Sequence, residues 1–280
     1  MKAARQLVQF SMVVICNAAG LLAASGADDS SGDASLSAAV CPIVYRLDQS
    51  PSSRGYRYTF YGNAFFINEE GYLLTAAHVL ETFRNGGQPS IVVTRPNSPP
   101  QLIPITAIAA DAQHDVVILR ATPNPFGSHS RVTYLSLASD PAVVGQAVLA
   151  LSLHPARLRD AQSFQSPVED RSAGQVLSFE TTQLEKSSPT AEVFLLSHPV
   201  TRGQSGSPVM AADSHAVIGL IEGRWLRNSI AYLASSKDSS ASVPGAAVPI
   251  SYAISLLDQK GIAWHAAPHN AANSGSPAKQ

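Results

Sequence analysis

Short runs of apolar residues alternate with turn-forming residues along most of the chain, and Val, Ile, Thr and Tyr are concentrated in these runs. Runs of this length, bounded by Gly, Pro, Asn and Ser, are typical of short β-strands. The pattern predicts an all-β protein with two successive sets of strands, each large enough for one six-stranded barrel. The first set is expected near residues 42–48, 57–67, 71–75, 90–95, 101–110 and 115–121. The second set is expected near residues 145–153, 173–182, 192–197, 207–211, 216–222 and 244–250.

The segment after the last predicted strand changes to the period of a helix. Its apolar positions recur three and four residues apart: Ile250, Ala253, Ile254 and Leu257. Ser251 is suited to cap the start of a helix, and Gly261 is suited to end one. We therefore expect a short C-terminal helix.

An apolar stretch, residues 7–24, follows the basic residues Lys2 and Arg5, and small residues precede Asp28. This order is typical of a secretory signal peptide. A retained anchor is the alternative, but polar residues within the stretch weaken a membrane-spanning helix. We expect a signal peptide at residues 1–27 and, after its cleavage at Ala27, a secreted or periplasmic protein without a membrane anchor.

Composition divides the remaining chain into four parts. Residues 28–40 are rich in Ser, Ala, Asp and Gly and predict a flexible mature N-terminus, while residues 263–280 predict a disordered tail. A stretch rich in Pro, Gly and Ser ends near residue 135 and separates the two strand sets. The expected halves are residues 41–135 and 136–262.

The charge balance limits the class of partner. Charged residues make up 14% of the chain and the formal net charge is −1. A nearly neutral chain gives no electrostatic reason to expect nucleic acid or an anionic membrane as a partner.

The two cysteines, Cys16 and Cys41, limit covalent and metal chemistry. If Cys16 leaves with the signal peptide, Cys41 has no intrachain partner, and its place beside Pro42 at the start of a strand predicts a buried free thiol. The chain contains neither an HExxH motif nor paired cysteines. It therefore gives almost no support for a zinc hydrolase, and we expect no metal.

Candidate chemistry begins with the six residues GQSGSP at positions 203–208. Gly203 can adopt a positive φ at no steric cost, which would let its N–H point beside the N–H of Ser205. Two converging donors beside a hydroxyl suit acyl transfer, because negative charge develops on the substrate oxygen as the nucleophile adds. Taken alone, the motif is more often a tight turn between strands.

A base and an acid occur earlier in the chain. His78 follows a short apolar strand and two alanines, and Asp115 stands at the head of the apolar run VVIL. A carboxylate at the mouth of a buried strand is costly unless something binds it, and an imidazole N–H is a suitable partner. Each residue alone has an ordinary structural interpretation, but together with Ser205 they supply a base, an orienting acid and a nucleophile.

The order His78, Asp115, Ser205 and the motifs TAAH, HDVVIL and GQSGSP resemble the trypsin-like serine peptidases, in particular bacterial HtrA-type and glutamyl-endopeptidase-type members. The similarity runs from about residue 61 to residue 261. It implies two six-stranded antiparallel β-barrels with a short C-terminal helix, residues 41–135 carrying His78 and Asp115 and residues 136–262 carrying Ser205. It also implies a bacterial source.

The resemblance assigns a role to each of these residues. His78 is the general base for Ser205, which forms the acyl-enzyme, and Asp115 orients the imidazole. The N–H groups of Gly203 and Ser205 form the oxyanion hole. The implied reaction is endopeptidase cleavage of protein or peptide substrates, and it requires no cofactor.

Two positions depart from the family pattern. Trypsin has an aspartate before the nucleophile that pairs with a newly cleaved N-terminus, whereas Gln204 carries no charge. We therefore expect no trypsin-style activation switch. Ser207 replaces a glycine, as in glutamyl-endopeptidase-type members. No PDZ domain fits after residue 262, so the regulatory module of HtrA-type proteins is expected to be missing.

By resemblance, the specificity pocket is built from a set of residues on both sides of the nucleophile: His198, Pro199, Val200, Thr201, Glu222, Gly223, Arg224 and Gly245. Glu222 could attract a basic substrate side chain or pair with Arg224. Gly245 suggests an unobstructed pocket. The sequence slightly favours a small or medium apolar preference and leaves the choice open.

Two functions from different classes remain. The first is an active exported serine endopeptidase. The second is a catalytically silent relative that keeps the fold and serves as a binding or scaffold protein. The intact triad and both glycines favour the enzyme, since a silent copy has no chemical reason to retain them.

Overall fold

The computed structural model describes residues 36–47, 57–81, 88–95, 98–127, 132–155, 167–184, 189–226, 229–231 and 243–268. The predicted signal peptide, residues 1–27, lies outside these ranges, as do residues 28–35 and 269–280. Within the described ranges, no helix combines the length and the apolar character that crossing a membrane requires.

The first barrel has the six strands that the pattern predicts. They are β1 (Val40–Leu47), β2 (Arg57–Phe66), β3 (Tyr72–Ala76), β4 (Pro89–Arg95), β5 (Ser98–Asp111) and β6 (Val116–Ala121). Antiparallel pairing in the order β1-β2-β3-β6-β5-β4 is closed by pairing of β4 with β1. A four-residue helix, α2 (His78–Glu81), follows β3 directly. Alternate side chains of the strands fill the interior because successive residues point to opposite faces.

The second barrel contains six predicted strands and one that the pattern did not predict. They are β7 (Ala147–His154), β8 (Val168–Thr182), β9 (Ala191–Leu196), β10 (Pro208–Ala211), β11 (Val217–Leu226), β12 (Ser229–Ala231) and β13 (Gly245–Pro249). The sheet order is β10-β7-β8-β9-β13-β11-β12, and pairing of β10 with β11 closes a six-stranded barrel. The unpredicted strand, β12, extends this barrel by pairing with the end of β11.

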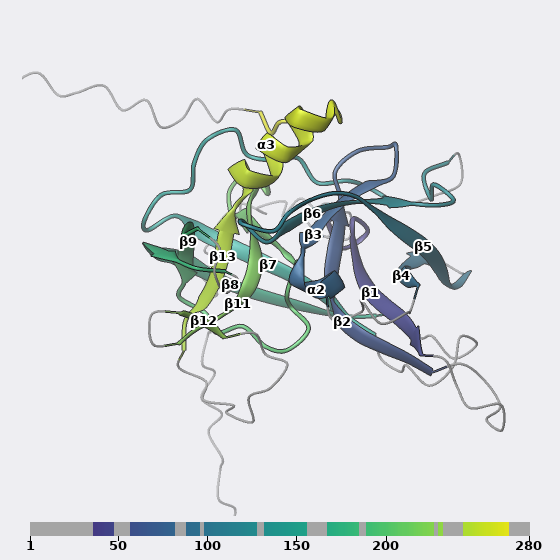
Figure 1. Cartoon of the computed structure of the whole chain (residues 1–280), viewed down its shortest axis with the longest axis horizontal. Coiled ribbons are helices and arrows are strands. Elements are labelled where there is room, and N and C mark those ends of the chain that lie inside the picture. The colour runs from purple at the N-terminus through teal and green to yellow at the C-terminus, as the bar shows by residue number, and fades with distance from the viewer. Residues whose placement is uncertain are drawn as a thin grey trace, which may run out of the picture.

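The two barrels lie side by side and share a core (Figure 1). Side chains such as Phe65 and Ile118 of the first barrel and Leu151 and Leu220 of the second belong to one buried cluster. Helix α3 (Ile250–Lys260), yellow in Figure 1, packs against β5 and β6 of the first barrel and β11 and β13 of the second. The predicted double-barrel fold with its C-terminal helix is therefore confirmed.

The start of α3 differs from the prediction and its end agrees. Pro249, with extended backbone angles, precedes the first helical residue, and no side chain caps the helix. The predicted cap, Ser251, lies one residue inside the helix, because burial of Ile250 against the core brings that residue into the first turn. Gly261 ends the helix in the left-handed conformation with a φ of 64°.

Each of the two segments predicted to be flexible or disordered includes folded residues. Leu36 begins a helical turn, and Ala39 and Val40 are buried in the core, so the predicted flexible segment 28–40 includes folded residues. At the other end, residues 263–268 return along the chain. Leu137 donates its N–H to the carbonyl of His265 at 2.8 Å and accepts the N–H of Ala267 at 2.9 Å. The predicted disordered tail, 263–280, is therefore wrong for its first six residues.

Cys41 lies in β1 and is a buried free thiol, as predicted. Burial raises the pKa of this thiol far above its ordinary value. A thiol that stays protonated is a poor nucleophile. Cys41 is therefore part of the packing of the first barrel.

Candidate active site

The turn between β3 and α2 and the turn before β6 bring His78 and Asp115 together. The His78 Nδ1 lies 2.5 Å from the Asp115 Oδ2, and the His78 backbone N–H donates to the Asp115 Oδ1 at 2.7 Å. The Asp115 carbonyl accepts the N–H of Ala77 at 2.9 Å. Asp115 has a φ of 54°, a conformation uncommon outside glycine, and these three bonds hold it there. The pair is therefore fixed in position and in ring orientation.

Asp115 is 4% exposed, and its charge depends on its neighbours. Burial alone would raise the pKa of this carboxyl group. The positive charge that His78 can carry and the hydrogen bonds from His78 together outweigh burial and lower the pKa of Asp115. A buried ionised carboxylate at the Nδ1 of His78 leaves the opposite ring nitrogen as the acceptor of a proton.

The loop between β9 and β10 carries Ser205 between two glycines with left-handed backbones. Gly203 has a φ of 94° and Gly206 a φ of 75°. A Cβ on Gly206 would lie 2.1 Å from the Thr75 Oγ1, so only glycine fits against the first barrel. Ser205 is 8% exposed, and its Oγ donates to the carbonyl oxygen of Glu222 at 3.2 Å.

The backbone of this loop leaves two donors free. The N–H groups of Gly203 and Ser205 have no acceptor among the residues that the structure describes, whereas Gln204, Gly206 and Ser207 each donate to a backbone carbonyl. Two unpaired N–H groups that flank a serine hydroxyl can bind an oxygen that becomes negatively charged.

Asn63 of β2 holds this loop against the first barrel and was not among the predicted site residues. Its Nδ2 donates to the Gly203 carbonyl at 2.9 Å and its Oδ1 accepts the Leu153 N–H at 3.0 Å. Its backbone N–H donates to the Ser205 carbonyl at 2.9 Å. Asn63 is fully buried, and an amide directly before the apolar run AFFI was the sequence signal that could have identified it.

The residue before Ser205 forms a second set of contacts. Gln204 is buried, its Oε1 accepts the Thr201 N–H at 2.6 Å, and its Nε2 donates to the Asp170 Oδ2 at 3.0 Å. These bonds stabilise the loop from within the second barrel. Asp170, in β8, is a further site residue that the sequence did not indicate, because β8 begins earlier than its alternation suggested.

The residues proposed for the specificity pocket separate into two places. Gly245 donates its N–H to the His198 carbonyl at 3.0 Å, and a Cβ on Gly245 would lie 2.6 Å from the Val200 Cγ1. His198 and Gly223 are buried, and Pro199 and Thr201 are exposed at the surface beside them. Burial lowers the pKa of His198, although Asp170 opposes the shift. A role for these residues in substrate binding stays a prediction.

Glu222 lies elsewhere, beside His78 and Asp115. Its side chain has no exposed surface, and its Oε2 is 3.6 Å from the His78 Nδ1. This position differs from both alternatives that the sequence left open, the attraction of a basic substrate group and a pair with Arg224, and a role in substrate binding stays a prediction. The carboxylate takes this position because β11 directs it toward the interior, where the two barrels meet.

His78, Asp115 and Glu222 each place a potential ligand atom within 4.8 Å of the others, a spacing that invites comparison with a metal site. Zinc holds nitrogen and oxygen ligands at about 2.0 Å in tetrahedral geometry, which separates them by about 3.3 Å. The 2.5 Å between the His78 Nδ1 and the Asp115 Oδ2 is a hydrogen bond instead. The geometry favours proton transfer over metal binding.

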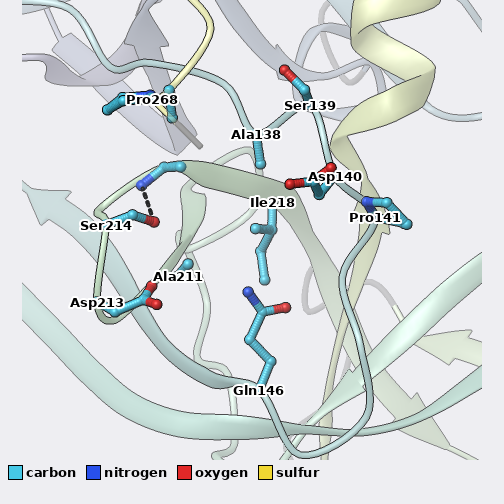
Figure 2. Close-up of a pocket in the computed structure, with 12 residues that line it drawn as sticks. Ala138, Ser139, Asp140, Pro141, Gln146, Ala211, Asp213, Ser214, Ile218 and Pro268 are labelled. Atoms are coloured by element: carbon cyan, nitrogen blue, oxygen red, sulfur yellow. Dashed lines mark hydrogen bonds between the residues drawn. The ribbon is translucent and has the colours of Figure 1, made fainter. Parts of the chain in front are cut away.

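A hollow of about 200 Å³ lies apart from these residues, between the start of the second barrel and the segment that follows α3 (Figure 2). Polar side chains from separate turns line it, among them Asp140, Gln146 and Ser214. None of the predicted catalytic or pocket residues borders this hollow. The candidate active site is therefore defined by its side chains and not by the hollow.

Comparisons with known proteins agree with the fold. A family model described as a trypsin-like peptidase domain matches residues 62–220. The HtrA-type protease AlgW with decapeptide has a TM-score of 0.59 at 16% identity, over 82% of this chain and 66% of that chain. The Rv3671c protease from M. tuberculosis, active form, has a TM-score of 0.56 at 17% identity, over 83% of this chain and 85% of that chain.

A second structure of AlgW, with tripeptide, is also similar, and the match covers 62% of the length of that chain. At these identities the structures share the fold. A search of curated proteins found no match.

Proposed function

The chain belongs to the trypsin-like peptidase family, and from this we propose that it is an exported serine endopeptidase. The proposal rests on the hydrogen-bonded His78–Asp115 pair together with the Ser205 loop, in which the N–H groups of Gly203 and Ser205 have no acceptor among the described residues. The N-terminal sequence pattern supports export.

In the proposed reaction, His78 removes the proton of the Ser205 hydroxyl as that oxygen attacks a peptide carbonyl. Asp115 holds the imidazole in the tautomer that can accept the proton and stabilises the imidazolium. The N–H groups of Gly203 and Ser205 bind the carbonyl oxygen as its charge develops. His78 then gives the proton to the leaving amine, and water releases the acyl group from Ser205.

Peptide chains are the proposed substrates. The structures of AlgW with a decapeptide and with a tripeptide support this class by analogy. The side chain of Val200 fills the space beside Gly245, so this glycine gives no support for an unobstructed pocket at the cleaved bond. The competing function, a silent binding protein, would need no free pair of N–H groups beside Ser205.

Labelling by a fluorophosphonate, which modifies only an activated serine, tests the proposal. We expect the mature protein to be labelled and to cleave casein, and Ser205→Ala to do neither. Ser214→Ala is the matched control, because Ser214 lies in a loop at the hollow of Figure 2, and it should label as the parent does. A folded parent that neither reacts with the probe nor cleaves casein would favour the binding protein.

A further inference from the structure

Glu222 is a buried acid whose carboxylate oxygens have no hydrogen-bond partner among the described residues. Its side chain has no exposed surface. An ionised carboxylate in such a place costs several kcal/mol unless it is paired. The charge state of Glu222 therefore needs an explanation.

The available donor near Glu222 is already in use. The proton on the His78 Nδ1 points to the Asp115 Oδ2 at 2.5 Å, whereas the Glu222 Oε2 is 3.6 Å from that nitrogen, beyond hydrogen-bond distance. Asp115 also accepts the His78 backbone N–H. Of the two acids, Asp115 has the donors that an anion requires and Glu222 has none.

Two ionised carboxylates only accept hydrogen bonds, so they can bond to each other only if one is protonated. Like charges at one buried site raise the pKa of one member of the pair. Burial, followed by the charge of Asp115, raises the pKa of Glu222 well above its ordinary value. These effects agree with the geometry in assigning the proton to Glu222.

We propose that Glu222 is a positioning residue of the active site, a neutral carboxylic acid that donates its proton in a hydrogen bond to the Asp115 carboxylate. This inference rests on the proposed peptidase function for its kinetic consequence, though not for the location of the proton. Glu222 fixes Asp115 without adding charge beside His78. The backbone carbonyl of Glu222 accepts a hydrogen bond from the Ser205 hydroxyl at 3.2 Å. One residue of β11 therefore contacts the proposed nucleophile through its backbone and lies beside Asp115 through its side chain.

The titratable groups that face Glu222 are His78 at the start of α2 and Asp115 in the turn before β6. When Glu222 loses its proton as pH rises, the hydrogen bond to Asp115 is lost and a second negative charge appears beside His78. The activation of Ser205 then changes with the state of Glu222 as well as with that of His78.

Infrared spectroscopy of the mature protein locates the proton without reference to activity. With glutamate labelled by ¹³C, we expect a protonated-carboxyl C=O band at neutral pH that is absent in Glu222→Gln. Glu192→Gln is the matched control, because Glu192 is an exposed carboxylate of β9, and the band should persist there. The same absence of a band in the parent and in Glu222→Gln would overturn the proposal.

The fluorophosphonate reaction rate across pH tests the positioning role. Glu222→Leu removes the donor and should slow labelling about tenfold to a hundredfold, the worth of one hydrogen bond to a charged group. Glu222→Gln has an amide donor and should recover most of that loss, and its rate should lack the decline that deprotonation of Glu222 causes in the parent. If both variants react at the parent's rate and keep the parent's pH profile, the positioning role is overturned.

The two hypotheses fail in different ways. If the infrared band is present and specific to Glu222 but the parent does not react with the probe, the peptidase proposal fails and the location of the proton stands. If the parent reacts and the band is missing, the proposal for Glu222 fails and the peptidase remains.

Discussion

The Asn63 side chain donates a hydrogen bond to the Gly203 carbonyl at 2.9 Å across 140 positions of the chain. This bond joins β2 of the first barrel to the nucleophile loop of the second. Asn63 also accepts the Leu153 N–H and donates its backbone N–H to the Ser205 carbonyl. The conformation of the loop therefore depends on how the barrels are joined.

Asn63→Ala should destabilise the protein and slow its reaction with a fluorophosphonate. It leaves the Leu153 N–H and the Gly203 carbonyl unpaired, which costs about 2–5 kcal/mol of unfolding free energy. A displaced oxyanion donor should slow labelling at least about tenfold. Urea denaturation and labelling kinetics measure the two effects.

Asn68→Ala is the control for this prediction. Asn68 is also buried and donates to the Ala263 carbonyl at 2.6 Å, but it has no contact with the nucleophile loop. It should lower stability and leave the labelling rate of the folded protein unchanged. Equal slowing in both variants would mean that Asn63 acts only through stability.

Gly206→Ala tests how closely the nucleophile loop approaches the first barrel. The new methyl would lie 2.1 Å from the Thr75 Oγ1 and 2.4 Å from the Asn63 carbonyl oxygen, at a φ of 75°. Gly145→Ala has a similar φ of 83° and open space around it, so it should cost only the backbone strain, about 1–2 kcal/mol. Gly206→Ala should lose about 1–3 kcal/mol more in urea denaturation. Equal losses would contradict the close approach.

The strands could be predicted because short amphipathic runs record which faces are buried. β12 escaped prediction because three residues, Ser229–Ala231, are too few to show a period, and they form a strand only by pairing with β11. The segment 263–268 was missed for a similar reason. Its bonds to Leu137 use backbone groups, which leave no trace in side-chain pattern.

Only the site residues that stand in short recognisable sequence motifs could be predicted. His78 and Asp115 stand in recognisable local sequences, and the structure brings them together. Asp170 was not recognisable, because its partner Gln204 is 34 positions away and the pairing depends on the path of β8. The sequence identified Glu222 as a candidate pocket residue but did not indicate its contact with His78. This contact arises only when β11 meets the first barrel.

Gln204→Met should slow labelling about fivefold to tenfold, because it removes two hydrogen bonds that each contribute modestly to the order of the loop. The methionine has a similar volume but cannot accept from Thr201 or donate to Asp170, so the loop before Ser205 becomes less ordered. Asp170→Asn retains an oxygen acceptor for the Gln204 amide and should have a smaller effect. A faster reaction in Gln204→Met would contradict the stabilising role of this side chain.

A chain that ends at residue 262 should be less stable than one that ends at residue 268. Among the hydrogen bonds that the shorter chain loses are three to backbone carbonyls, from Asn68 to Ala263, from Leu137 to His265 and from Ala267 to Leu137. At about 0.5–1.5 kcal/mol for each bond, the expected loss is about 2–4 kcal/mol. Thermal or urea unfolding of the two chains measures it, and equal stability would show that the returning segment contributes nothing.

The stability of Glu222→Gln relative to the parent should increase with pH. Because the pKa of Glu222 is raised in the folded state, the folded parent holds one more proton than the unfolded chain from near the ordinary value of 4.5 up to the raised value. Over that window the parent loses unfolding free energy as pH rises, by up to about 1.4 kcal/mol per pH unit. Glutamine has no proton to lose, so the free-energy difference between the variant and the parent should widen from about pH 5 upward.

Urea denaturation at several pH values measures this difference, with Glu192→Gln as the exposed control that should show no widening. A constant difference across this range would mean that Glu222 is ionised in the folded protein.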